Sequence, residues 1–113
     1  MRKKTIFLLV ALTTALTVTL VFAKNQPPAE RGKAHFNNPE FAGGKRSCNS
    51  CHPNGRDLEQ AGSKSSFAIM GGQQGSLAEV VNLCIVNASK GNAIGVDSTE
   101  MQEMVSYIKS LGK

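Results

Sequence analysis

Hydrophobic positions follow the period of an α-helix in two segments of the chain. Between residues 77 and 88, apolar side chains recur every three or four positions, at Leu77, Val80, Val81, Cys84 and Ala88. A second stripe lies between residues 101 and 111, at Met101, Met104, Val105, Ile108 and Leu111. This spacing puts the apolar side chains of each segment on one face, so the sequence predicts two helices that each bury a face.

The residues that flank these stripes are typical of helix ends. Ser76 and Glu79 form an S-x-x-E capping box at the start of the first stripe, and Gly91 follows its end. The second helix is expected to open at Asp97 or Ser98, and it ends before Gly112. Both segments therefore have the boundary signals as well as the period of a helix.

The rest of the chain predicts shorter or irregular structure. A short helix is expected from Arg31 to about Phe36, with Ala34 and Phe36 buried. The segment from Asn54 to Gly75 is rich in glycine and serine and is expected to be irregular throughout. Since no segment alternates polar and apolar residues over any length, we predict an all-α fold.

The N-terminus has the organisation of a signal peptide. Arg2, Lys3 and Lys4 precede an uncharged run from Thr5 to Phe22, and Ala23 is a suitable last residue before cleavage. We expect residues 1–23 to be removed from a periplasmic or otherwise exported protein. The alternative is an uncleaved N-terminal anchor, because the run approaches the length of a membrane span. The mature chain would comprise a disordered linker at residues 24–30 and one domain at residues 31–113.

Cleavage changes the charge of the protein. Of 113 residues, 13 are Lys or Arg and 8 are Asp or Glu, which gives a net charge of +5, but three of these cations belong to the signal peptide. The mature net charge is then +2, the charges are scattered and aromatic residues are few. Nucleic acid is therefore not expected as a partner, and neither is a membrane after signal cleavage.

The chemistry of the sequence lies in Cys48-Asn49-Ser50-Cys51-His52. In an exported chain, C-x-x-C-H is typical of the attachment site of a c-type haem. Thiols three positions apart on one helical turn can each form a thioether with a haem vinyl group, and His52 would then be the proximal iron ligand. A nearby backbone carbonyl can orient the imidazole through its other nitrogen. We therefore expect one covalent haem c, held by Cys48 and Cys51.

Other uses of this motif are less consistent with the rest of the sequence. A thioredoxin-like dithiol needs strands in a βαβ pattern, which the sequence lacks. A zinc site needs a second pair of ligands, and only Cys84 and His35 remain, at unrelated spacing. A structural disulfide between Cys48 and Cys51 is the most ordinary alternative.

With this motif, the mature chain resembles a class I c-type cytochrome. Residues 32–36 look like the first helix of that family and residues 104–111 like its last. The resemblance implies a small all-α fold around one haem, in which the first and last helices cross. It also implies a crossing contact of Phe36 with Tyr107 or Ile108.

The sixth iron ligand is left open by the sequence. Met101 follows the middle helix, as the ligand methionine of the family does, but the usual long methionine loop is missing. Met70 comes early, in a glycine-rich loop, and Met104 shares the apolar stripe of the last helix. His35 and water complete the alternatives, with His35 expected on the first helix, exposed or half covered.

Cys84 is the other main candidate. The sequence from Val81 to Met101 is similar to a segment of the dihaem thiosulfate dehydrogenases, in which the matching cysteine is the axial ligand of the catalytic haem. The present chain has one haem motif instead of two. A buried, inert thiol is the plain alternative for Cys84, although an unpaired thiol is uncommon in an exported protein.

Two functions follow from these expectations. The favoured one is a one-electron carrier, without catalytic residues, that exchanges electrons with redox partner proteins such as other cytochromes, a reductase or an oxidase. The alternative is a haem subunit or enzyme of thiosulfate or sulfur oxidation. That alternative needs Cys84 as an iron ligand and a cationic pocket, for which Lys45, Arg46, Arg56 and Lys64 are available.

Overall fold

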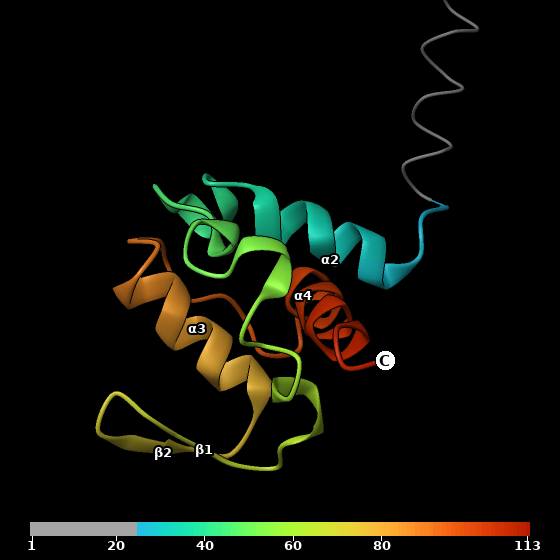
Figure 1. Cartoon of the computed structure of the whole chain (residues 1–113). Helices are drawn as coiled ribbons and strands as arrows, with labels where there is room; N and C mark the ends of the chain where they lie inside the picture. The colour runs from blue at the N-terminus through green and yellow to red at the C-terminus, as the bar shows by residue number, and fades with distance from the viewer. Residues whose placement is uncertain (1–24) are drawn as a thin grey trace, which may run out of the picture.

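The computed structural model describes residues 25–113, and the signal peptide expected at residues 1–23 lies outside them. The described chain contains the helices α2 (Pro28–Asn37), α3 (Leu77–Asn87) and α4 (Thr99–Ser110), and a hairpin of strands β1 (Phe67–Ile69) and β2 (Gly72–Gln74) (Figure 1). Between α2 and the hairpin the chain forms four short 3-10 turns, at Phe41–Gly43, Cys48–Ser50, Pro53–Gly55 and Ala61–Ser63. None of the helices in residues 25–113 is long and apolar enough to cross a membrane.

Helix α2 starts earlier than the sequence predicts. It begins at Pro28, so residues 28–30, expected in the linker, are helical. Proline suits the first turn of a helix because the amide hydrogen that it lacks would have no partner there. Phe36 is buried as expected, but Ala34 is exposed and Gly32 is buried in its place.

The crossing of α2 over α4 forms the centre of the fold (Figure 1). The rings of Phe36 and Tyr107 meet edge to face with their centroids 5.1 Å apart, which confirms the expected contact. Gly32 allows this close approach, since a Cβ atom at that position would lie 1.9 Å from the carbonyl oxygen of Glu103. The first and last helices therefore pack backbone against backbone.

The two helices predicted from the apolar stripes are confirmed. The capping box of α3 is complete, with Ser76 accepting from the Glu79 amide and the Glu79 carboxylate accepting from the Ser76 amide. Helix α4 is capped by Ser98 instead of Asp97. Most of the stripe of α4 lies in the hydrophobic core, which consists of Phe36, Val81, Ile85, Met101, Met104, Tyr107 and Ile108.

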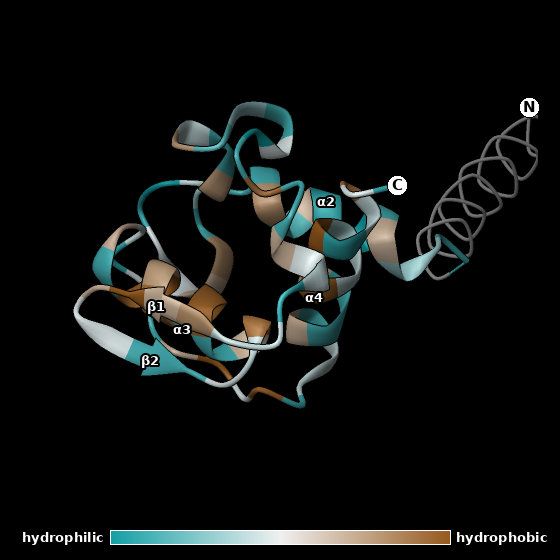
Figure 2. Ribbon diagram, turned by 60° about the horizontal axis from the view of Figure 1, so that its bottom comes forward, coloured by the Kyte–Doolittle hydropathy of each residue, from teal (hydrophilic) through white to brown (hydrophobic). Residues whose placement is uncertain are grey.

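The predicted all-α, cytochrome c-like fold class is wrong, because residues 67–74 form an antiparallel hairpin in the segment expected to be irregular. Phe67 pairs with Gln74 and Ile69 with Gly72, which leaves Met70 and Gly71 as a two-residue turn. Both turn residues have positive φ, as a type I′ turn requires. In Figure 2, β1 is hydrophobic and β2 largely hydrophilic. The described chain is thus a small mixed fold of helices and one two-stranded sheet.

Candidate functional site

The Cys48–His52 motif forms a tight turn. A 3-10 turn covers Cys48–Ser50, and the Cys48 carbonyl accepts hydrogen bonds from the amides of Cys51 and His52 at 3.2 and 3.0 Å. Cys48 is half-buried and packs against the core, whereas Cys51 is exposed. The turn therefore presents one thiol of the pair to the interior and the other to the surface.

The His52 imidazole is oriented by the backbone that follows it. Its Nδ1 lies 3.0 Å from the carbonyl oxygen of Arg56, so Nδ1 carries the hydrogen and Nε2 keeps a free lone pair. The loop that brings this carbonyl back to the ring depends on Gly55. Its φ is +79°, and a Cβ there would lie 2.4 Å from Leu111. The nearby carbonyl expected from the sequence to orient the imidazole is thus that of Arg56.

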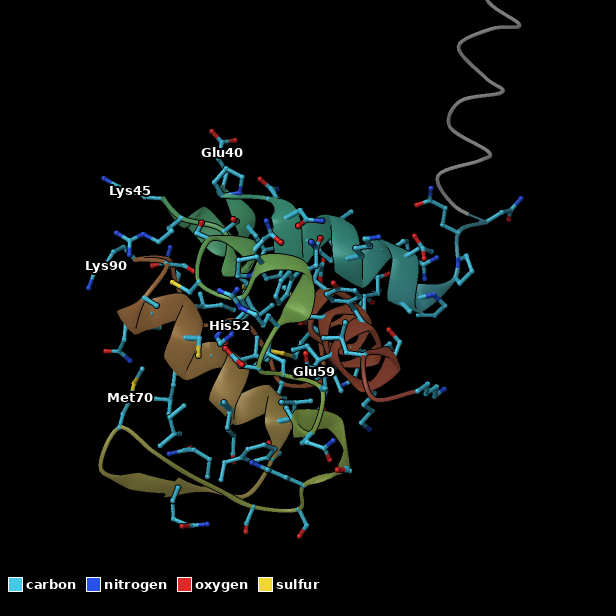
Figure 3. All side chains as sticks on the ribbon, viewed as in Figure 1. Glu40, Lys45, His52, Glu59, Met70 and Lys90 are labelled. Atoms are coloured by element: carbon cyan, nitrogen blue, oxygen red, sulfur yellow. The ribbon has the colours of Figure 1, made fainter. Side chains whose placement is uncertain are left out.

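His52 and Cys48 line a cavity of about 510 Å³. This volume lies within the range of roughly 300–1,000 Å³ that is usual for cofactor pockets. One wall is the face of α3 formed by Leu77, Val80, Val81 and Cys84, and another is strand β1. The inner surface is built from Phe36, Met104 and Ile108, where α2 and α4 cross. Figure 3 shows His52 in the segment that lies between α3 and α4.

The cavity is apolar apart from a few side chains. Leucine, isoleucine, valine and phenylalanine side chains dominate its walls, and the polar groups outside the motif are Asp57, Gln60, Lys64 and Ser66. Such a surface suits a large, flat, mainly hydrophobic group that carries a small number of polar substituents. The thiol of Cys48, the imidazole of His52 and the apolar walls together fit a covalent haem.

The candidates for the sixth ligand occupy different places. Cys84 lines the cavity, on the α3 wall. Met101 is 0% exposed and belongs to the core without lining the cavity. Met70 is 59% exposed at the tip of the hairpin (Figure 3) and also lies outside the lining. Of the two main candidates, only the cysteine shares the cavity with His52.

The two remaining protein candidates also differ in their surroundings. Met104 is fully buried and lines the inner surface of the cavity as part of the α4 stripe. His35 is half-buried and does not line the cavity. Its Nε2 lies 2.8 Å from a carboxylate oxygen of Glu103, and its ring stacks on Phe41.

The thiols around the cavity influence one another. Burial raises the pKa of Cys48 to about 11, and the charges of Cys84 and Cys51 add to the increase. Burial, followed by the charge of Cys51, also raises the pKa of Cys84. All three cysteines are free thiols. Both Cys48 and Cys84 are therefore protonated at neutral pH until a metal or a covalent bond replaces the proton.

The cationic pocket needed for sulfur chemistry is only partly present. Lys64 lines the cavity, whereas Lys45, Arg46 and Arg56 do not. In residues 25–113, no group of three or more His, Cys, Asp or Glu side chains is placed to hold a metal ion. The thiols and imidazole of the motif are thus not gathered into a zinc-type cluster.

Some wall residues had no functional signal in the sequence. Phe67, Ala68 and Ile69 line the cavity because β1 packs beside α3, and Leu58 and Ala61 line it from the loop after the motif. A loop rich in glycine and serine gave no sign that it would form a wall.

No family model, no curated protein and no solved structure matches the chain.

Proposed function

We propose that the protein is an exported c-type cytochrome that carries single electrons between redox partner proteins. The observation that carries this proposal is the cavity, because it brings His52 and Cys48 of the C-x-x-C-H motif together with apolar walls in one site. A covalent haem would supply an iron centre that cycles between the ferric and ferrous states.

The residues of the chain have separate roles in this proposal. Cys48 and Cys51 would hold the haem through thioethers, one from the cavity and one from the surface. His52 would ligate the iron through Nε2, because the Arg56 carbonyl holds the hydrogen on Nδ1. The side chains of α3, β1 and the α2–α4 crossing would exclude water from the haem faces.

Cys84 is the sixth ligand that the geometry favours. It lies in the same cavity as His52, whereas Met101 would have to leave the core and Met70 would have to bring the tip of the hairpin inward. A thiolate is a strong, anionic ligand of ferric iron and lowers the reduction potential. The carrier would therefore operate at low potential.

Thiosulfate or sulfur oxidation is the second candidate function. Cys84 at the cavity favours it, because a cysteine-ligated haem is what the resemblance to thiosulfate dehydrogenases implies. Lys64 is the one cation of the expected pocket that lines the cavity. An electron carrier needs no anion-binding pocket. The residues that line the cavity therefore meet the requirements of a carrier more fully than those of a sulfur-oxidising enzyme.

Expression in a host that matures c-type cytochromes tests the main proposal. The purified protein should carry one haem that survives acid extraction, and the Cys48→Ala/Cys51→Ala variant should carry none. A mediated titration should show one reversible one-electron step. A wild-type protein without covalent haem, or one that cannot be reduced, would refute the proposal. Haem reduction by thiosulfate alone would favour the second function.

Spectroscopy of two variants tests the sixth ligand. Cys84→Ser should change the ferric low-spin spectrum and raise the reduction potential, whereas Met101→Leu, an apolar replacement of similar volume, should leave both unchanged. Electron paramagnetic resonance of the wild type should show thiolate ligation, and the weak red absorption band of methionine-ligated ferric haem should be absent. The opposite pattern would assign Met101.

A further inference from the structure

The turn that orients the His52 imidazole is itself held by a residue of the haem motif. Residues 53–55 form this short 3-10 turn, and the carbonyl of Arg56, directly after it, accepts from His52 Nδ1 at 3.0 Å. The side-chain oxygen of Asn49, which lies between the two cysteines of the motif, accepts from the Asn54 amide at 2.8 Å. The motif therefore supplies both the proximal histidine and a contact to the turn that provides its backbone partner.

The backbone prepares both partners of the contact between Asn49 and Asn54. The amides of Cys51 and His52 donate to the carbonyl of Cys48, so the backbone on either side of Asn49 is fixed. Asn54 has a φ of 54°, in the left-handed region, which asparagine tolerates better than most residues. Because a backbone N–H faces the Asn49 side chain, the atom at this contact is the oxygen of its amide group and not the nitrogen.

The contact is the one place where a side chain holds an amide of this turn. The amides of Gly55 and Arg56 donate to backbone carbonyls within residues 52–56, at 2.8 and 3.1 Å. The amide of Asn54 donates to the Asn49 side chain instead. Removal of that side chain would leave this amide to water, and the backbone at the positive φ would lose its anchor.

The two sides of the turn are held in different ways. On the inner side, Gly55 is buried against Leu111, and a Cβ at Gly55 would lie 2.4 Å from that side chain. On the outer side, Asn49 is half-buried and Asn54 is exposed. The outer side therefore depends on a hydrogen bond where the inner side depends on packing. A change at Asn49 should move the Arg56 carbonyl while the packing against Leu111 stays in place.

We propose that Asn49 is a positioning residue for the proximal iron ligand, because it holds the turn whose carbonyl orients the His52 imidazole. This inference rests on the proposed cytochrome function and adds a residue that adjusts the reduction potential. A hydrogen bond from Nδ1 to a carbonyl makes Nε2 a stronger electron donor. Stronger donation favours ferric over ferrous iron, so Asn49 lowers the reduction potential without being a ligand.

The midpoint potentials of two holoprotein variants test the proposal. Asn49→Ala should raise the potential, because the preference of the site for ferric iron falls by up to about tenfold, or about 59 mV for one electron. Ser50→Ala is the matched control. Ser50 is the other residue between the cysteines, and its hydroxyl contacts Ser47 at 2.9 Å instead of the turn. The control should keep the wild-type potential, and equal potentials in the two variants would refute the proposal.

Nuclear magnetic resonance detects the positioning itself. In Asn49→Ala, the hyperfine-shifted resonances of the His52 ring in the ferric protein should move, and the Asn54 amide should exchange its hydrogen about tenfold faster. Asn49→Asp keeps an acceptor oxygen at this place and should restore both properties. If the Asn54 amide exchanged as fast in Asn49→Asp as in Asn49→Ala, the anchoring role would be refuted.

The added charge of Asn49→Asp needs a control of its own. Ser50→Asp introduces the same charge at the next position, so the two aspartate variants should have similar potentials. A potential of Asn49→Asp as high as that of Asn49→Ala would contradict the proposal. Asn49→Leu keeps the shape of asparagine without the acceptor, and it should raise the potential as alanine does. It replaces the alanine variant if that variant does not fold, and a wild-type potential in Asn49→Leu would also refute the proposal.

The same samples separate failure of this proposal from failure of the proposed function. A wild-type protein without covalent haem would refute the electron-carrier function and the role of Asn49 together. If wild type and all variants carry haem and are reversibly reduced, but Asn49→Ala matches Ser50→Ala in potential and in the His52 resonances, only the positioning role is refuted.

Discussion

Gly32 determines how closely α2 and α4 approach each other. An alanine Cβ at this position would lie 1.9 Å from the Glu103 carbonyl oxygen and 2.9 Å from the Tyr107 Cβ. Both neighbours belong to α4, so the helices would have to separate. We predict that Gly32→Ala lowers the free energy of unfolding of the holoprotein by about 3 kcal/mol, as in other overpacked cores, measured by denaturant titration.

Gly95→Ala is the matched control for this prediction. A Cβ at Gly95 would meet its nearest neighbours at 3.8 Å, which is an ordinary contact, and φ is not positive there. Its effect should stay within about 0.5 kcal/mol. Equal effects of the two substitutions would contradict the close helix crossing as the cause of the destabilisation.

Met70 has a local backbone conformation that fits its side chain poorly. It occupies the first position of the turn between β1 and β2 with a φ of 52°, where asparagine and glycine are favoured. Met70→Asn should therefore raise the free energy of unfolding by about 1 kcal/mol, measured by denaturant titration. The ferric spectrum should not change, because Met70 lies outside the cavity. A changed spectrum would reveal Met70 as an iron ligand.

The sequence identified the candidate site around the Cys48–His52 motif, but it left the choice of the sixth iron ligand open. The C-x-x-C-H motif is local, so its spacing alone is enough to predict a haem-attachment role. The choice between Cys84 and Met101 depends on which helix face meets the cavity. Met101 shares the stripe of Met104 and Ile108, and this periodicity already placed it on a buried face. That Cys84 lies opposite the motif depends on how α3 packs, which no local pattern contains.

At the scale of whole elements, α2 and α4 are joined by a charged cluster as well as by the core. The Glu103 carboxylate on α4 receives a hydrogen bond from the Arg31 guanidinium at 2.5 Å, and its other oxygen contacts His35 at 2.8 Å. Burial alone would raise the pKa of Glu103. The hydrogen bonds and charges of Arg31 and His35 outweigh burial and lower the pKa below its ordinary 4.5.

This lowered pKa predicts how stability depends on pH. In the folded protein Glu103 stays ionised at pH values where the unfolded chain takes up a proton, so its contribution is complete above pH 4.5 and is lost as pH falls through the lower folded value. Glu103→Gln should reduce the free energy of unfolding by about 1–3 kcal/mol at pH 7. The difference in the free energy of unfolding between wild type and Glu103→Gln should become smaller in acid. Thermal unfolding at several pH values measures this difference.

Glu100→Gln provides the control for the pH experiment. Glu100 lies in the first turn of the same helix and is exposed, so its substitution should cost no more than about 0.5 kcal/mol. A gap between wild type and Glu103→Gln that stays constant from pH 7 into acid would show that packing, and not charge, accounts for the role of Glu103.

The elements differ in how well the sequence predicted them. Helices α3 and α4 have caps and apolar stripes within a dozen residues, and both are confirmed. The hairpin was missed because each strand has three residues, too few to show alternation, and because its turn contains Met-Gly instead of Asn-Gly. Its stability comes from packing beside α3 and not from local preference. The Glu103 cluster joins residues about 70 positions apart and leaves no local pattern either.

At the scale of the whole molecule, the cavity makes the fold dependent on what fills it. Without an apolar group in it, the cavity of about 510 Å³ leaves the apolar side chains of its walls incompletely buried, at a cost of roughly 25 cal/mol per Å² of apolar surface. Burial of these walls by a haem would matter for a small domain, whose entire stability is only roughly 5–15 kcal/mol. Side chains of α3, β1 and α4 line the cavity. A haem that filled the cavity would contact all of them and so would connect the α2–α4 core to α3 and β1.

We therefore predict that Cys48→Ala/Cys51→Ala, which cannot attach haem covalently, loses most of its helical circular dichroism and its cooperative thermal transition. Cys51→Ala is the control, because it keeps the thioether at Cys48, the thiol that lines the cavity. It should remain folded and melt at a lower temperature than wild type. If the double variant melted cooperatively near the wild-type temperature without haem, the walls would be stable by themselves, and the cavity would be a preformed pocket for a dissociable ligand.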